Sequence, residues 1–189
     1  MVPTVPLMSL WLPILVSAVL VFIASSVIHM MIGYHRADYR RVPAEDATAE
    51  ALRKAAIPPG DYMLPSPGSR NAMKDPVFRE KLTRGPVVFM TVLRPGPPTM
   101  GPQLIQWFAY CVMVSILAAY LTGSAVGPGG ESVRVFCFAC TAAFLAYALA
   151  HWQNMIWYKR SLGTTIRNTI DGLIYGLLTG TAFAWLWPR

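Results

Sequence analysis

Charged residues are scarce in this chain. Only 13% of its 189 residues are Asp, Glu, Lys or Arg, while 54% are hydrophobic. A soluble globular domain is usually about one quarter charged. The composition therefore predicts a membrane protein rather than a soluble one.

Cysteine is also rare, and the three cysteines all lie inside apolar runs, at Cys111, Cys137 and Cys140. This placement excludes a visible extracellular disulfide framework and is typical of small buried packing residues. The spacing of Cys137 and Cys140 is one helical turn within an apolar run, which favours packing over metal or redox chemistry.

Acidic residues number only 9 against 16 Lys and Arg, which gives a formal net charge of +7. A nucleic-acid-binding protein gathers its basic residues on a solvated face. Here they flank apolar runs instead, which excludes nucleic acid as the expected partner and points to the headgroups of a lipid bilayer.

Four apolar runs are long enough to cross a bilayer as helices, which takes about 20 residues each. The N-terminal run lacks the basic residues that begin a secretory signal peptide, so we interpret it as a retained helix. The sequence predicts an all-α integral membrane protein with a first transmembrane helix over 1–33, a long Pro-rich cytoplasmic loop over 34–102, and a three-helix transmembrane segment over 103–189, its spans at about 103–121, 133–158 and 165–187.

The distribution of Lys and Arg predicts the orientation, because positively charged loops stay in the cytoplasm. Eleven basic residues lie between 34 and 102, and Lys159, Arg160 and Arg167 lie at the connection before the last run. Only Arg134 and Arg189 lie on the opposite side. We expect a multi-pass protein of the bacterial inner membrane with both termini in the periplasm.

The long loop contains 11 of the 16 prolines, which excludes extended helix over much of it. Short helices are expected over 43–56 and over 75–85, the second with Asp75 as its N-cap. The segment 86–96 is expected to form a strand or an interfacial segment that pairs with 61–65. The loop has no Gly-rich phosphate-binding motif and no nucleophile motif, so an enzymatic function is not expected.

Asp171 is the strongest site-like feature, because a carboxylate inside an apolar helix needs a partner or a task. Arg167 precedes it by one turn, so the two are expected to neutralise each other. Tyr175 and Thr179 continue the same helical face. A second stripe of small residues runs beside it, at Gly172, Gly176, Gly180 and Ala184. Small residues at this spacing let another helix approach closely, so we expect the last helix to be buried in a bundle or an oligomer interface.

His29 and His151 are expected at the same depth as Asp171, near the cytoplasmic ends of their helices. Two imidazoles and a carboxylate suit a transition metal, and two imidazoles from different helices can ligate a haem. Water or headgroup contacts are the alternative for such histidines. No cofactor is favoured over that alternative. His35, beside Arg36, is expected at a solvated interfacial position.

Two stretches carry a resemblance, Gly-Tyr-His-Arg at 33–36 and HWQNMIWYKRSLGTTIRNTIDGLIYGLLTGTAFAWLWP at 151–188. Together with the order of the runs, they resemble small uncharacterised four-helix bacterial inner-membrane proteins. This resemblance implies the bacterial inner membrane and carries no assigned activity.

The expected function is that of a non-enzymatic accessory, assembly or scaffold component of a membrane complex, with a protein partner or a second copy of the chain. One alternative is a small proton-coupled transporter that uses Asp171, which requires a cavity around Asp171 rather than a closed pair with Arg167. The other is a haem- or metal-binding redox subunit that uses His29 and His151.

Overall fold

The computed structural model describes residues 4–97 and 99–188 and is mostly helical. It divides into two compact units, one formed by the residues up to 39 together with those from 99 onward, and the other by residues 40–98 of the long loop. The elements of the first unit are η1 (Leu7–Leu10), α1 (Trp11–Ser26), η2 (Val27–Ile32), η3 (Tyr34–Asp38), α4 (Gly101–Ala125), α5 (Ser132–Ala148), α6 (Ala150–Tyr158) and α7 (Leu162–Trp185).

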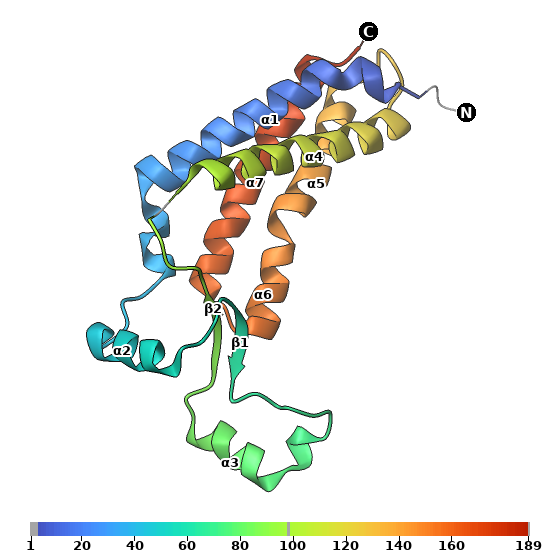
Figure 1. Ribbon diagram of the computed structural model, residues 1–189. Coiled ribbons are helices and arrows are strands. Elements are labelled where there is room, and N and C mark those ends of the chain that lie inside the picture. The colour runs from blue at the N-terminus through green and yellow to red at the C-terminus, as the bar shows by residue number, and fades with distance from the viewer. Residues whose placement is uncertain (1–3, 98, 189) are drawn as a thin grey trace. The chain divides into compact units, whose positions relative to one another are not determined.

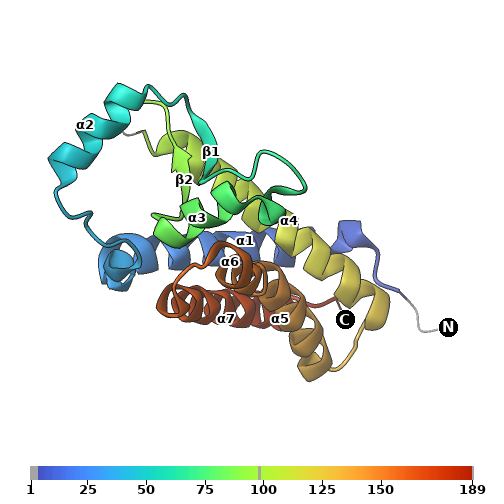
Figure 2. The ribbon, with the colours of Figure 1, turned by 90° about the horizontal axis from the view of Figure 1, so that it is seen from below.

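The first unit is a four-helix bundle in which each long helix has two neighbours. Contacts join α1 to α4, α4 to α5, α5 to α7, and α7 back to α1, which closes the ring (Figures 1 and 2). Both termini lie at one end, where the Val5 amide bonds to the Gly123 carbonyl and the Gly129 amide to the Pro188 carbonyl. At the other end α1 finishes and α7 begins. We call this second end the Asp171 end.

Three helical segments are long and apolar enough to cross a membrane, namely Leu7–Ile32, Gly101–Ala125 and Ser132–Tyr158. They correspond to the first three predicted spans. The third is interrupted at Leu149, where α5 gives way to α6 and the Leu149 amide bonds to the Leu145 carbonyl at 3.4 Å. The fourth predicted span is a helix, α7, but it does not reach the same apolarity because polar residues occupy its first half.

The small-residue stripe of α7 lies against α5, as its spacing predicts. A Cβ built on Gly172 would lie 2.8 Å from the Ala148 side chain, and one built on Gly180 would lie 2.9 Å from the Phe136 carbonyl oxygen. At Gly176 the Cys140 carbonyl oxygen would be 3.0 Å away. The two backbones therefore approach as closely as they do because these positions carry no side chain.

Polar side chains also join the helices across the bundle. Ser17 of α1 donates to Ser115 of α4 at 3.0 Å, and the Trp107 indole donates to Ser25 at 2.7 Å. The Tyr110 hydroxyl donates to the Ala146 carbonyl at 3.0 Å. Such pairs leave few polar groups of the bundle without a partner.

The second unit contains α2 (Glu45–Ala55), β1 (Gly60–Leu64), η4 (Ala72–Lys74), α3 (Pro76–Arg84) and β2 (Val88–Val92). The two strands pair antiparallel, with Gly60 opposite Val92 and Leu64 opposite Val88, which confirms the expected pairing. Asp75 caps α3 by accepting a hydrogen bond from the Val77 amide, as predicted. The hairpin lies in the long loop, where this strand pairing was expected, and the chain as a whole is mostly helical.

Replacing Gly176 by leucine should lower the stability of the bundle by about 1–3 kcal/mol, since the added side chain would overlap the α5 backbone. Thr181→Leu is the matched control, because it adds a leucine at an exposed position of the same helix. Thermal unfolding in mild detergent measures both variants. Equal melting temperatures for the two would contradict the close contact between α5 and α7.

Candidate functional site

The chain reverses direction directly after the first long helix. The helix ends in a π-helical segment, η2, which contains His29, and π-helical turns are uncommon and often occur at functional sites. Gly33 follows with φ +68°, a backbone conformation that glycine adopts without strain. The 3-10 helix η3 comes next and carries Tyr34, His35 and Asp38 back toward α7.

Asp171 of α7 is buried, and two of these side chains form hydrogen bonds with its carboxylate. The Tyr34 hydroxyl donates to its Oδ1, and His35 Nε2 lies 2.7 Å from its Oδ2. His35 Nδ1 lies 2.6 Å from Oδ2 of Asp38. One imidazole therefore bridges two carboxylates, and a protonated ring donates a hydrogen bond to each.

Arg167 binds Asp38 and not Asp171. Its Nε donates to Asp38 Oδ1 at 2.7 Å, and its Nη2 lies 2.5 Å from the same oxygen. Burial raises the pKa of the Asp38 carboxyl, but the hydrogen bonds that it accepts outweigh burial, so its pKa lies below the ordinary value. The expected pair of Arg167 with Asp171 was wrong, because η3 brings a nearer carboxylate to the arginine.

His29 completes a group of three potential metal ligands. Its ring meets the His35 ring edge-on, with the centroids 4.5 Å apart. One ligand atom each from His29, His35 and Asp171 lie within 4.8 Å of one another. We call these three residues the His-His-Asp cluster.

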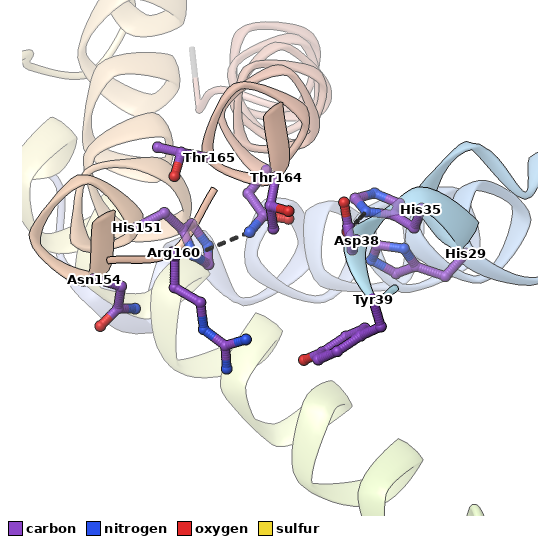
Figure 3. Close-up of a pocket in the computed structure, with 10 residues that line it drawn as sticks. His29, His35, Asp38, Tyr39, His151, Asn154, Arg160, Thr164 and Thr165 are labelled. Carbon is purple, nitrogen blue, oxygen red and sulfur yellow. Dashed lines mark hydrogen bonds and ion pairs between the residues drawn. The ribbon is translucent and has the colours of Figure 1, made fainter. Parts of the chain in front are cut away.

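His151 lies apart from this cluster, on the far side of a polar cavity of about 360 Å³. Figure 3 shows His29, His35 and Asp38 on one side of the cavity and His151, Asn154 and Arg160 on the other. The His151 Nδ1 lies 3.3 Å from the Asn168 side-chain nitrogen. His151 was the predicted partner of His29, but the residue that lies beside His29 is His35.

Tyr175 and Thr179 are both buried on α7, as their position on the face of Asp171 predicts. Thr179 donates to the Tyr175 carbonyl at 2.8 Å. A second cavity of about 450 Å³ is lined by Tyr175 and Asp171. Asp171 thus borders a cavity and is not closed off by Arg167, which removes the self-neutralising interpretation of this carboxylate.

Three members of the site were not among the predicted site residues, namely Tyr34, His35 and Asp38. His35 was expected in a solvated position, but its side chain is only 15% exposed. The signal that could have found them is Gly33, since a glycine directly after a long apolar helix permits the left-handed turn that folds the next residues back.

Comparisons of the chain with protein families, with curated proteins and with solved structures found no significant match. The chemistry of the site therefore has to follow from its own geometry.

The ion pair can be tested by a double-mutant cycle. Asp38→Asn and Arg167→Gln should each destabilise the bundle, and the double variant should lose less than the sum, with a coupling of about 0.5–3 kcal/mol. The side chains are only 9% and 23% exposed, so solvent screens this pair less than a surface pair.

The matched cycle combines Asp171→Asn with Arg167→Gln. Coupling in this cycle should be weaker than in the first, because Arg167 and Asp171 share no hydrogen bond in the part of the chain that the structure describes and are linked only through Asp38 and His35. Thermal unfolding in detergent measures both cycles. Strong coupling in the Asp171 cycle and none in the Asp38 cycle would contradict the arrangement.

Proposed function

We propose that this chain is a multi-pass membrane protein that holds a divalent transition-metal ion at the Asp171 end of its bundle, as a non-enzymatic accessory component of a membrane complex. The observation that supports the proposal is the His-His-Asp cluster, whose three ligand atoms lie within 4.8 Å of one another. The cluster draws on η2, η3 and α7, so a bound ion would also join the first helix to the last.

The donor set favours a first-row transition metal. Imidazole nitrogen suits zinc, iron, copper and nickel, whereas magnesium and calcium prefer oxygen ligands alone. Two histidines and one carboxylate form zinc sites and non-haem iron sites in which other coordination positions stay open. An ion here would replace the hydrogen bond between His35 and Asp171 by two coordinate bonds, and a rotation of the exposed His29 ring would complete the set.

Asp38 supports the same interpretation from outside the cluster. A histidine that binds a metal usually donates its other ring N–H to a carboxylate, which fixes the orientation of the ring. Asp38 occupies this position on His35 at 2.6 Å, and Arg167 holds Asp38 in turn. A chain of hydrogen bonds thus runs from Arg167 through Asp38 to the His35 ring, which would bind the ion.

The geometry gives less support to the other two functions expected from the sequence. Haem ligation needs two imidazoles that face each other across the iron, but His29 packs edge-on against His35, and His151 lies across the polar cavity. A proton carrier requires only the carboxylate beside a cavity. The two histidines gathered at Asp171 are the feature that favours metal binding.

We also propose that α7 is a fourth membrane span. Its large exposed side chains are apolar and share one face, whereas most of its polar and small residues face the bundle. The large exposed side chains are Leu162, Ile166, Ile170, Leu173, Leu177 and Trp185. This pattern is the reverse of that of a soluble helix and suits a lipid-facing surface.

The zinc affinity of the protein tests the metal proposal. Metal-depleted protein in mild detergent should bind Zn²⁺ or Co²⁺ at one ion per chain, and Mg²⁺ should not compete. His29→Gln should lower the affinity at least tenfold, because it removes one ligand. Asp38→Asn should lower it by about 10–100-fold through the orientation of His35.

His151→Gln is the matched control, since it removes the one histidine outside the cluster, and it should leave the affinity unchanged. His29 is the preferred ligand variant because its side chain is exposed and its loss should leave the fold intact. Equal losses in His29→Gln and His151→Gln, or an affinity for Zn²⁺ no higher than for Mg²⁺, would refute the site.

The proposed topology has both termini in the periplasm of a bacterial inner membrane, because 14 of the 16 basic residues then lie in the cytoplasm. An alkaline phosphatase fusion at residue 70 should be inactive, and a fusion after residue 188 should be active. The opposite pair of activities would overturn the orientation.

A further inference from the structure

The metal proposal uses only one side of the polar cavity, the side formed by η2 and η3. The opposite side is formed by α6 and the turn that follows it, and it carries His151, Asn154 and Arg160 (Figure 3). The volume of about 360 Å³ lies within the range of small-molecule sites in proteins. The α6 side therefore has room for a ligand of its own.

The turn after α6 fixes the backbone of Arg160 beside the cavity. Lys159 ends the helix with φ +55°, and the Arg160 amide then bonds to the Asn154 carbonyl at 3.4 Å. The Arg160 guanidinium lies over the Tyr39 ring, 5.7 Å from its centroid. In the part of the chain that the structure describes, Arg160 forms no ion pair with a carboxylate. Its positive charge is therefore available to a ligand.

Two neutral donors lie on the same side. The Asn168 side-chain nitrogen lies 3.3 Å from His151 Nδ1 and donates to it, which leaves the hydrogen of a neutral ring on Nε2. Asn154 is three residues farther along α6, so it shares a helical face with His151. Its side-chain amide has no hydrogen-bond partner among the described residues. With Arg160, these groups can donate hydrogen bonds to several oxygens of one anion.

The charges that line the polar cavity favour an anion over a cation. Asp38 is the one carboxylate among the described residues that line it. Arg167 neutralises this carboxylate, and His35 also bonds to it. Asp171 does not line this cavity. The guanidinium of Arg160 is thus the charge at the cavity that lacks a counter-charge.

The location of the cavity narrows the kind of anion. In the proposed topology the Asp171 end faces the cytoplasm, and the exposed Trp152 and Trp157 of α6 are typical of a membrane interface. Basic pockets between helices on the cytoplasmic side of a membrane bind the headgroups of anionic lipids. The anionic part of such a headgroup is a phosphate group, which soluble compounds also carry.

We propose that the polar cavity binds a phosphate group, supplied either by an anionic phospholipid or by a soluble phosphate. Arg160 donates to the phosphate oxygens through its guanidinium, whose paired N–H groups match this geometry. His151 Nε2 and the Asn154 amide donate to the remaining oxygens. Only the lipid source rests on the proposed topology. The site needs no metal, so a failure of the metal proposal would leave it unaffected.

Two measurements on metal-depleted protein in mild detergent distinguish the two sources. Calorimetric titration with inorganic phosphate detects a soluble ligand, and native mass spectrometry with added phosphatidylglycerol detects a bound lipid. Saturable binding of inorganic phosphate would identify the soluble source, and saturable binding of phosphatidylglycerol alone would identify the headgroup. For the probe that binds, Arg160→Gln should lower the affinity at least tenfold, because it removes charge-assisted hydrogen bonds. Asn154→Ala should lower it about threefold to tenfold, the loss of one neutral hydrogen bond.

Lys159→Gln is the matched control, because it removes the same charge from the adjacent position, which does not line the cavity. Its affinity should stay within about twofold of the parent. Arg160→Gln should keep the melting temperature of the parent and its affinity for Zn²⁺ in phosphate-free buffer, since the exposed Arg160 touches no member of the His-His-Asp cluster. Equal losses in Arg160→Gln and Lys159→Gln would indicate attraction by surface charge and would refute the site, as would the absence of saturable binding for both probes.

Discussion

The buried carboxylate of Asp171 determines the structure of one end of the bundle. An ionised group in an apolar helix is costly unless it is hydrogen-bonded and paired. Tyr34 and His35 satisfy it, and they can do so only because Gly33 turns the chain back toward α7. The same reversal brings Asp38 to Arg167, so a single left-handed residue positions both interactions.

The long helices are organised in the opposite sense to those of a soluble protein. Their large apolar side chains face outward, and alanine, glycine, serine and threonine fill much of the interior. In lipid there is no hydrophobic effect to bring helices together, so close packing and short polar links have to do it. Close packing is seen where α5 approaches Gly172, Gly176 and Gly180. A short polar link is seen in the hydrogen bond between Ser17 and Ser115.

The helices could be predicted from the sequence, but the partners within the site could not. Length, apolar composition and glycine spacing are local features, and they located α1, α4, α5 and α7 and the contact face of α7. The pairing of Arg167 with Asp171 rested on the same kind of local rule, the spacing of four residues on one helix. It failed because a carboxylate 129 residues earlier in the chain lies closer to the arginine, and no spacing rule on one helix can find such a contact. His35 was missed for the same reason, since its environment depends on a turn and not on the polarity of its neighbours.

The two cavities at the Asp171 end share part of their walls. His29 and His151 line both of them, while Asp171 borders only the second cavity, of about 450 Å³, and His35 only the polar one. An ion held by the His-His-Asp cluster would therefore contact residues of both cavities. A small molecule in the second cavity would lie beside His29 and Asp171, so the ion and this molecule would change each other's affinity through these two side chains. Such coupling would have to be reciprocal, because binding free energies at two linked sites change by the same amount in either order.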